Sequence, residues 1–311
     1  MTLETTAHDC EAHMACERRL GSATVTAPPR DAGERKRGRL GAVWAGVFAL
    51  TLAVVGCAGG QPVNNTPVEE VFSEPRARAL AAAAGRGDSA EVQRLVKAGA
   101  DPNARGRQGV VPLAWAMSHR SYAGMRALLR AGADPNASSA PGLTPLELAA
   151  GSSDHELLRI LLDAKADPNA TTSDGDPVLH VAVLHEQLPN VQLLVERGAR
   201  VDSRDRSGQT AANLATSASL WDIVGWLLEH GADPTLPDSG GGTVANGWAE
   251  SGRPDDARWR AEYDRVGHLM QQRGVRLPPE TPEQVRLRVL GPNNPIDARI
   301  RRERAARGTA P

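Results

Sequence analysis

Aromatic side chains are scarce in this sequence of 311 residues, where they make up 3% of the chain. With so few large rings, alanine and leucine must fill most of the core that the 41% of hydrophobic residues can build. Small side chains of this kind suit thin helices that pack closely together, and they argue against a large globular interior.

The chain also has no excess of either charge sign and few cysteines. The formal net charge is −1, so no overall field favours nucleic acid as a partner. The cysteines are Cys10, Cys16 and Cys57, so no disulfide framework supports the rest of the chain. His13 lies between the first two, but residues 1–34 lack the apolar periodicity of a scaffold that could hold a four-ligand metal site. We therefore expect no metal site.

Motifs that carry chemistry are absent as well. The sequence has no phosphate-binding loop, no HExxH, no nucleophile elbow and no pair of cysteines with zinc spacing. We expect neither an enzyme nor a cofactor or small-molecule substrate.

What the sequence does contain is one phrase that returns every 33 residues. It reads AGADPNA at 98–104 and 131–137 and AKADPNA at 164–170, with looser copies at 197–203 and 230–236. Its glycine position is occupied by Gly99, Gly132, Lys165, Gly198 and Gly231. A fixed period of this length is typical of an array of stacked repeats.

The third unit shows most clearly what lies between the copies. Thr144 can cap a first helix whose first turn holds Pro145. Leucines at helical spacing over 154–164 predict a buried second helix. Glycine in the phrase supplies a left-handed turn after that helix, so Lys165 predicts a modestly strained one.

LTPLELAA at 143–150, together with the second helix and the ADPNA turn, resembles the ankyrin repeat pattern of TPLHxAA and GADxN. The resemblance implies an all-α ankyrin repeat solenoid over residues 74–278, with about five repeats and a degenerate terminal cap. About ten residues are inserted in that cap, around 253–264. His180, in the LH position, should form structural hydrogen bonds, and Trp115, Trp221 and Trp226 fall at core spacings.

The amino-terminal part has the features of a targeting segment. A basic cluster at 35–39 precedes the apolar run LGAVWAGVFALTLAVVG, which ends at Cys57. Residues 35–56 resemble a bacterial lipoprotein signal peptide, which implies that Cys57 is lipidated. Because Ala58 is not aspartate, the resemblance implies the periplasmic face of the outer membrane. An uncleaved transmembrane anchor is the alternative. Residues 1–34 are expected to be disordered or not translated, and residues 57–73 to form a flexible tether.

Residues 279–311 are rich in proline and then basic, and we predict a disordered tail. The alternative is that the tail contacts anionic lipid or cell wall, or folds back on the repeats.

Ankyrin arrays bind proteins with their loop tips and with the concave side of the first helices, so the resemblance implies a protein partner and a monomeric stack. The positions that correspond in this sequence are Arg107, Gln108, Val110, Ser118, His119, Ala140, Leu143, Ser152, Ser173, Asp174, Asp176, Leu184, His185, Arg206, Ser207, Gln209 and Ser217. His119, Leu143, Leu184 and His185 are expected to form one mixed apolar and imidazole patch. The chain would then act as an immunity protein that blocks a secreted toxin, or as a scaffold that protects a client under stress. The alternative function is a structural envelope protein that uses its basic tail.

Overall fold

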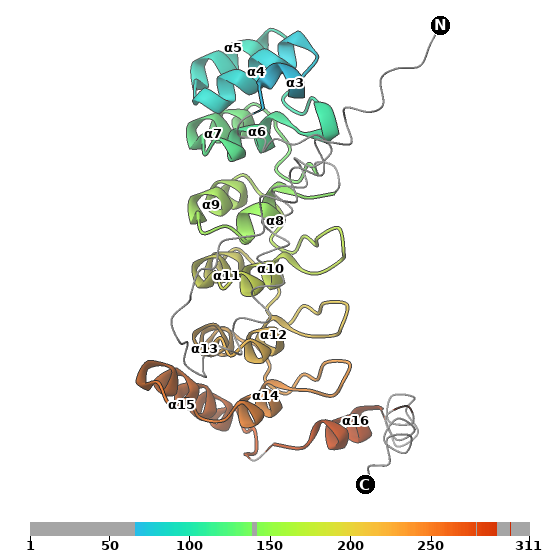
Figure 1. The fold of residues 1–311 in the computed structure, drawn as a ribbon, viewed down its shortest axis with the longest axis vertical. Coiled ribbons are helices and arrows are strands. Elements are labelled where there is room, and N and C mark those ends of the chain that lie inside the picture. Colours follow the sequence, from blue (N-terminus) through green and yellow to red (C-terminus); the bar gives the residue numbers. More distant parts are fainter. Residues whose placement is uncertain (1–65, 139–141, 278, 291–298, 300–311) are drawn as a thin grey trace, which may run out of the picture. The chain divides into compact units, whose positions relative to one another are not determined.

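The structure of the chain is a computed structural model that describes residues 66–138, 142–277, 279–290 and 299. Within these ranges the regular elements are helices, apart from two isolated bridges that join Thr171 to Pro177 and Arg204 to Thr210. The helices, which Figure 1 labels except for η2, are α3 (Val68–Val71), α4 (Pro75–Arg86), α5 (Ser89–Lys97), η2 (Arg107–Gly109), α6 (Pro112–Ser118), α7 (Tyr122–Arg130), α8 (Pro145–Ala150), α9 (His155–Asp163), α10 (Val178–Leu184), α11 (Leu188–Glu196), α12 (Ala211–Ser217), α13 (Trp221–Glu229), α14 (Val244–Ser251), α15 (Ala257–Gln272) and α16 (Pro282–Leu290).

The helices from α4 to α15 form antiparallel pairs that stack in two rows. The first helices of the pairs (α4, α6, α8, α10, α12 and α14) contact one another in order, and we call them the inner row. The second helices (α5, α7, α9, α11, α13 and α15) do the same and form the outer row. This arrangement confirms the predicted all-α repeat solenoid, with five regular units and a sixth that ends the array.

Leucines at two periodic positions form the core between the rows. In the inner row Leu80, Leu113, Leu146 and Leu179 are at most 1% exposed, and in the outer row Leu128, Leu161, Leu194 and Leu227 are fully buried. Burial of each such side chain contributes about 1.5–3 kcal/mol relative to exposure. The inner helices approach one another closely because the residues between these leucines are alanines, including Ala116, Ala149, Ala182 and Ala215.

The asparagine side chain of the recurring ADPNA phrase bonds to the backbone of the next unit. Asn103 Oδ1 accepts a hydrogen bond from the amide of Asp134 at 2.7 Å, and Asn169 Oδ1 accepts one from the amide of Arg200 at 2.8 Å. Asn136 makes the same bond to the amide of Asp167 at 3.2 Å. These side chains therefore hold neighbouring units together.

Lys165 occupies the left-handed position of the third phrase, where the other units have glycine. Its φ is 68°, while the glycines Gly99, Gly132, Gly198 and Gly231 have φ between 90° and 103°. A side chain with a Cβ atom is strained in this region by about 1–2 kcal/mol. The strained turn that the sequence predicted is thus present.

Replacing Lys165 with glycine should raise the free energy of unfolding by about 0.5–1 kcal/mol, because it relieves the strain at some cost in chain entropy. Urea denaturation followed by circular dichroism measures the change. The control is Lys165→Ala, which removes the charge but keeps the Cβ atom, and it should not stabilise the protein. Equal gains in the two variants would show that the lysine charge, and not the backbone, is responsible.

The fold begins earlier than the sequence predicted. We expected a flexible tether through residue 73, but α3 folds within it and Phe72 is only 1% exposed. The Phe72 ring packs edge-on against the Trp115 ring of α6, with 6.1 Å between ring centroids. The prediction is corrected for Val68–Ser73, because one large aromatic side chain is enough to hold this short segment on the first two units.

The predicted disordered tail is also partly folded. Residues Pro282–Leu290 form α16, in which Val285 is 3% and Arg286 is 8% exposed. The Arg286 guanidinium donates a hydrogen bond to the carbonyl oxygen of Gly240, in the loop before α14. Apolar burial and this bond together attach α16 to the last loop, so the prediction of disorder is corrected for Pro282–Leu290.

The sixth unit has the insertion that its length required, and the inserted residues lengthen its second helix. Asp256 caps α15 by accepting hydrogen bonds from the amides of Arg258 and Trp259, and the helix has 16 residues. Tyr263 of α15 stacks on Trp248 with 4.6 Å between ring centroids and meets Trp221 edge-on at 5.2 Å. This aromatic cluster closes the end of the core.

Several predictions fall on residues outside the described ranges. They concern the segment 1–34 with its cysteines and His13, the signal peptide at 35–56, Cys57, Ala140, and the chain after residue 290 apart from Arg299. Among the described residues no helix has the length and apolar character needed to cross a membrane.

Candidate partner-binding surface

The inner row presents an apolar stripe that the sequence predictions missed. The fourth residue of α8, α10 and α12 is Leu148, Val181 and Leu214, and each is half-buried against the core. Leu184, at the end of α10, is 43% exposed. Among the described residues it is one of two large hydrophobic side chains that are exposed. The signal that could have revealed the stripe is its 33-residue spacing, which is the same spacing that identified the turns.

The stripe is covered at its amino-terminal end. The fourth residue of α6 is Trp115, which is only 4% exposed because Phe72 packs on it. The open part of the stripe is therefore the part on α8, α10 and α12. We call Leu148, Val181, Leu184 and Leu214 the inner-row stripe.

Most of the predicted helix-end contacts are occupied by bonds within their own helices. Ser118 Oγ donates to the carbonyl oxygen of Trp115 at 2.8 Å, and Ser217 Oγ donates to that of Asn213 at 3.0 Å. The His119 ring lies 4.5 Å from the Trp115 ring, and its Nδ1 is 2.9 Å from the Trp115 carbonyl oxygen. These side chains shape the ends of the inner helices, and His119 and Ser217 remain exposed.

His185 and Ser152 join neighbouring units. The His185 ring lies over Gly151, where a Cβ atom would come within 2.8 Å of His185 Cδ2. Burial lowers the pKa of His185. Ser152 Oγ accepts a hydrogen bond from the amide of Asp154 at 3.0 Å and so shapes the turn after α8. Both residues therefore support the surface more than they project from it.

The structure does not bring the predicted patch of His119, Leu143, Leu184 and His185 together. Leu143 precedes the amino terminus of α8, whereas the other three lie at the carboxyl ends of α6 and α10. Leu143 thus lies at the opposite end of the inner helices from the other three. The single mixed patch is corrected to Leu184 and the stripe beside it.

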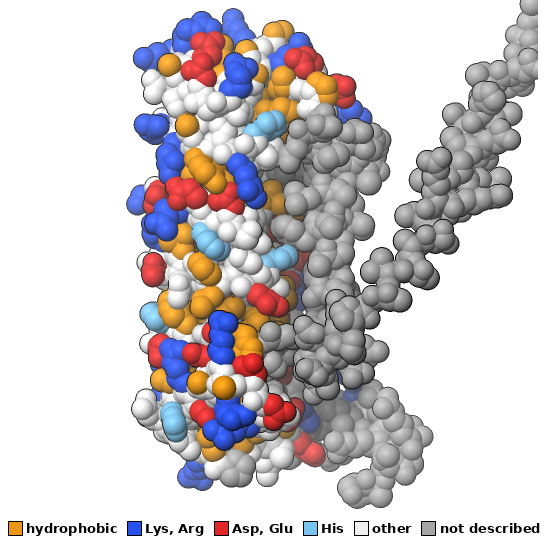
Figure 2. Space-filling model, turned by 60° about the vertical axis from the view of Figure 1, so that its left-hand side comes forward, with side chains coloured by type: hydrophobic (Ala, Val, Ile, Leu, Met, Phe, Trp, Pro, Cys, Tyr) orange, Lys and Arg blue, Asp and Glu red, His pale blue; other side chains and the backbone are white. Residues whose placement is uncertain are grey.

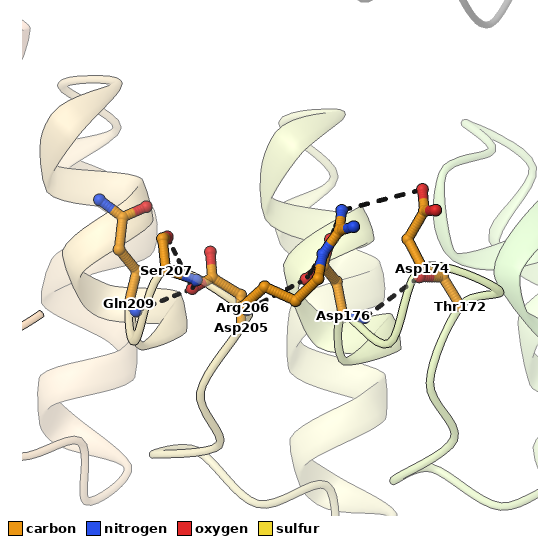
Figure 3. Close-up of polar contacts among 7 residues, drawn as sticks. All are labelled: Thr172, Asp174, Asp176, Asp205, Arg206, Ser207 and Gln209. Carbon is orange, nitrogen blue, oxygen red and sulfur yellow. Dashed lines mark hydrogen bonds and ion pairs between the residues drawn. The ribbon is translucent and has the colours of Figure 1, made fainter. Parts of the chain in front are cut away.

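Two hairpin loops, 171–177 and 204–210, project beyond the inner row and are joined at their tips (Figure 3). In the second loop Asp205 Oδ1 accepts hydrogen bonds from the amides of Ser207 at 2.9 Å and Gln209 at 2.8 Å. In the first loop the amide of Asp176 donates to Thr172 Oγ1 at 3.2 Å. Local bonds of this kind fix the conformation of each loop.

Arg206 links the two tips. Its guanidinium lies 3.2 Å from Asp176 and 3.9 Å from Asp174 of the preceding loop. Exposed ion pairs add about 0–1 kcal/mol to stability, so the main effect is to orient the side chains. Ser173, Asp174, Arg206 and Ser207 are exposed on these tips, and Gln209 and Asp176 are half-buried.

The loop of the second unit has a different structure. Arg107 and Gln108 are exposed on η2, where Gln108 has a φ of 56°. Val110 is 7% exposed and belongs to the cluster around Phe72 and Trp115. Its prediction as a contact residue is therefore wrong, because the segment before α4 folds over it.

The outer row offers a contrasting surface. Figure 2 shows basic, acidic and apolar side chains interspersed on it. Many of the charges pair between neighbouring helices, such as Arg126 with Glu156, and Arg197 with Asp163 at 2.7 Å. Leu184 of the inner row, by contrast, is one of the two exposed large hydrophobic side chains among the described residues, so the inner row is the better candidate.

Histidine and acidic side chains are spread over the repeats in the part of the chain that the structure describes. No group of three or more His, Cys, Asp or Glu side chains converges there to hold a metal ion. His180 is 1% exposed, and its Nε2 lies 3.0 Å from the carbonyl oxygen of Gln209. Because a carbonyl oxygen only accepts, Nε2 is the donor, which is the structural role that the sequence predicted.

Part of the chain matches a known protein family. Residues 146–238, which cover the third to fifth helix pairs, match the family described as ankyrin repeats (3 copies). No curated protein matches the chain. The ankyrin repeat family generally serves as a non-enzymatic scaffold for binding. The chain thus carries an all-α ankyrin repeat solenoid, a type of domain that acts as a protein–protein interaction module.

Proposed function

We propose that this chain is a lipoprotein held by Cys57 at the periplasmic face of a bacterial outer membrane, where its repeats bind one protein partner. The contact surface consists of the inner-row stripe and the tips of the loops 171–177 and 204–210. The partner is either a secreted toxin that the chain blocks as an immunity protein, or a client that it protects as a stress scaffold.

The observation that carries the proposal is an apolar stripe on the inner helices together with pre-formed loops at the amino-terminal ends of two of the same helices, α10 and α12. Leu184 is 43% exposed next to half-buried Val181, while Arg206 fixes the neighbouring tips. Interfaces commonly have an apolar centre that is surrounded by polar groups. A surface that is already ordered also loses less conformational entropy when a partner binds.

Replacing Leu184 with glutamate should reduce partner binding at least about tenfold, because it places a charge at the apolar centre of the contact. Crosslinking followed by mass spectrometry on intact cell envelopes identifies the partner and measures the loss. The matched control is Gln93→Glu, which adds the same charge to an exposed position on α5 of the outer row. If Leu184→Glu retains the partner as well as the control does, the inner-row stripe is not the contact surface.

The lipid anchor has a test of its own. Cells supplied with labelled palmitate should label the wild-type chain, and the Cys57→Ser variant should stay unlabelled. An unlabelled wild-type chain would exclude the anchor and leave the binding surface unaffected.

The alternative is a structural envelope protein that contacts lipid or cell wall through its basic tail. Part of that tail is used within the fold, since Arg286 bonds to Gly240 and Arg288 lies 3.0 Å from Glu280. Deletion of residues 291–311 separates the two functions while keeping α16. Partner binding that survives this deletion favours the inner-row surface, and binding to isolated cell wall that is lost with it favours the tail.

A further inference from the structure

The third residue of four successive inner helices occupies a shared position at which units are bonded together. The residues are Glu147, His180, Asn213 and Asn246. His180 Nε2 donates to the carbonyl oxygen of Gln209 at 3.0 Å, in the loop of the following unit. Asn213 Nδ2 donates in the same way to Leu236 at 3.1 Å, and Asn246 Nδ2 donates to Glu280. Three of the four side chains therefore provide a donor to a backbone carbonyl beyond their own unit.

Asn246 shows how both ends of such a side chain are used. Its Oδ1 accepts a hydrogen bond from the amide of Thr243 at 3.0 Å, while its Nδ2 points to the next segment. Glu147 sits in the same relation to Thr144, whose Oγ1 accepts from the Glu147 amide at 3.1 Å. Its Oε2 atom is buried and has no hydrogen-bond partner among the described residues. Glu147 Oε2 corresponds to the atoms with which His180, Asn213 and Asn246 donate their hydrogen bonds.

An ionised carboxylate has no hydrogen to donate at this place. Burial raises the pKa of Glu147, and the nearby charge of Asp174 raises it further, while a backbone hydrogen bond from Thr144 opposes both. A buried oxygen without a partner is costly in its charged form. The protonated form could instead donate, as the histidine and asparagines do in the following units.

Other charged groups on the elements packed against α8 are engaged elsewhere. Helix α6 has no charged residue, and the one titratable group of α10 within its bounds is His180, which bonds to Gln209. The ionisable residues of α9 each have another partner: His155 with Asn190, Glu156 and Arg159 with each other, and Asp163 with Arg197. In the loop 171–177, Asp176 is paired with Arg206. Asp174 lies 3.9 Å from the same guanidinium, and its charge is the one that raises the pKa of Glu147.

We propose that Glu147 is a proton-operated latch for the loop 171–177. When protonated, its carboxyl group donates a hydrogen bond to the backbone carbonyl of Asp176. Asp176 follows Glu147 by 29 residues, which is the same separation as between His180 and Gln209. When it ionises, that bond is lost, the carboxylate repels Asp174, and the loop loosens. Since this loop carries Ser173 and Asp174, acid would tighten one part of the contact surface; only this last consequence rests on the proposed function.

The sign of the pH effect follows from the protonation state. A group that is protonated more readily in the folded than in the unfolded chain contributes stability fully below its unfolded pKa, and loses it as the pH rises through the folded pKa. The latch should therefore be closed below the ordinary glutamate value of 4.5 and should open as the pH rises through the raised pKa of Glu147.

Glu147→Gln replaces Oε2 with an amide that donates at every pH. At pH 7.5 the variant should melt about 2–4 °C higher than the wild type, and at pH 4 the two should agree within about 1 °C. Amide hydrogen exchange in 172–176 at pH 7.5 should be slower in the variant. The control Glu196→Gln, at an exposed carboxylate of α11, should change neither measurement.

A second measurement uses the wild-type chain and needs no partner. The carboxyl carbon of Glu147, followed by nuclear magnetic resonance, should titrate above the ordinary glutamate value of 4.5. The latch is excluded if Glu147 titrates at or below that value, or if Glu147→Gln gains equally at pH 4 and pH 7.5. Because neither result involves partner binding, failure of the latch would leave the proposed function standing, and loss of partner binding in Leu184→Glu would leave the latch standing.

Discussion

Replacing Asn190 with alanine should lower the free energy of unfolding by about 3 kcal/mol, one of the two largest effects that we expect of any single substitution here. Asn190 is fully buried at the start of the fourth unit's outer helix. Its Nδ2 donates to the carbonyl oxygens of Ala150 and Ser152, each at 2.8 Å, and of Ala149 at 3.2 Å. Removing the amide takes this donor away from the carbonyls of Ala150 and Ser152, while the Ala149 carbonyl still accepts from the amide of Ser152.

The reason for this arrangement lies in the turn between α8 and α9. In other units a residue with positive φ, such as Gly87 or Glu186, lets the next amide bond back to the inner helix. In the fourth unit, for example, the amide of Gln187 bonds to the carbonyl of Ala182 at 2.9 Å. The third unit turns differently, because the amide of Asp154 bonds to Ser152 Oγ. Asn190 supplies from the neighbouring unit the donor that this turn lacks.

His155→Ala is the matched control for Asn190. His155 Nδ1 lies 2.9 Å from Asn190 Oδ1 and orients the amide, so its loss should cost only about 1 kcal/mol. Urea denaturation of both variants, and of the double variant, measures the two losses and their coupling. If Asn190→Ala costs no more than His155→Ala, the carbonyls at the end of α8 find other partners and the account of this turn is wrong.

Replacing Phe72 with alanine should also cost about 3–4 kcal/mol, the usual loss for a phenylalanine buried in a core. Phe72 is 1% exposed, and it fills the space between Trp115 and Gly106, where a Cβ atom would lie 2.9 Å from the phenyl ring. Its loss opens a cavity in the cluster that also contains Val71, Ala81 and Val110.

Phe72→Leu provides the comparison, because it keeps an apolar side chain of similar size and should cost about 1–1.5 kcal/mol. Unfolding followed by tryptophan fluorescence is suited to the test, since Trp115 lies in the altered cluster. If Phe72→Ala unfolds within about 0.5 kcal/mol of the wild type, residues 68–73 behave as the free tether that the sequence suggested.

Features that repeat with the 33-residue period could be predicted from the sequence, because each copy repeats the same local physics. The helix pairs, the strained turn at Lys165 and the structural role of His180 are of this kind. The inner-row stripe of Leu148, Val181 and Leu214 has the same period, so the spacing alone is enough to predict it.

Features that depend on a single long-range contact could not be predicted. Asn190 bonds to carbonyls about 40 residues earlier in the chain, and nothing in its local sequence indicates a partner. Val110 looked like a loop contact until Phe72 was found to cover its cluster. Residues 282–290 resemble a linker in composition, and their helix depends on burial of Val285 and on Arg286 reaching Gly240. In each case tertiary packing decided what local composition left open.

The central claim, that the inner-row stripe and the loop tips bind a protein partner, is tested most directly by site-specific photocrosslinking in living cells. A photoreactive residue is placed at Leu148, Leu184 or Ser173 on the proposed surface, and at Gln93, Arg159 or Glu196 on the outer row. We predict one discrete adduct of constant mass for the first three positions and none for the last three. An adduct that forms only from the outer row, or equally from both sides, would contradict the account.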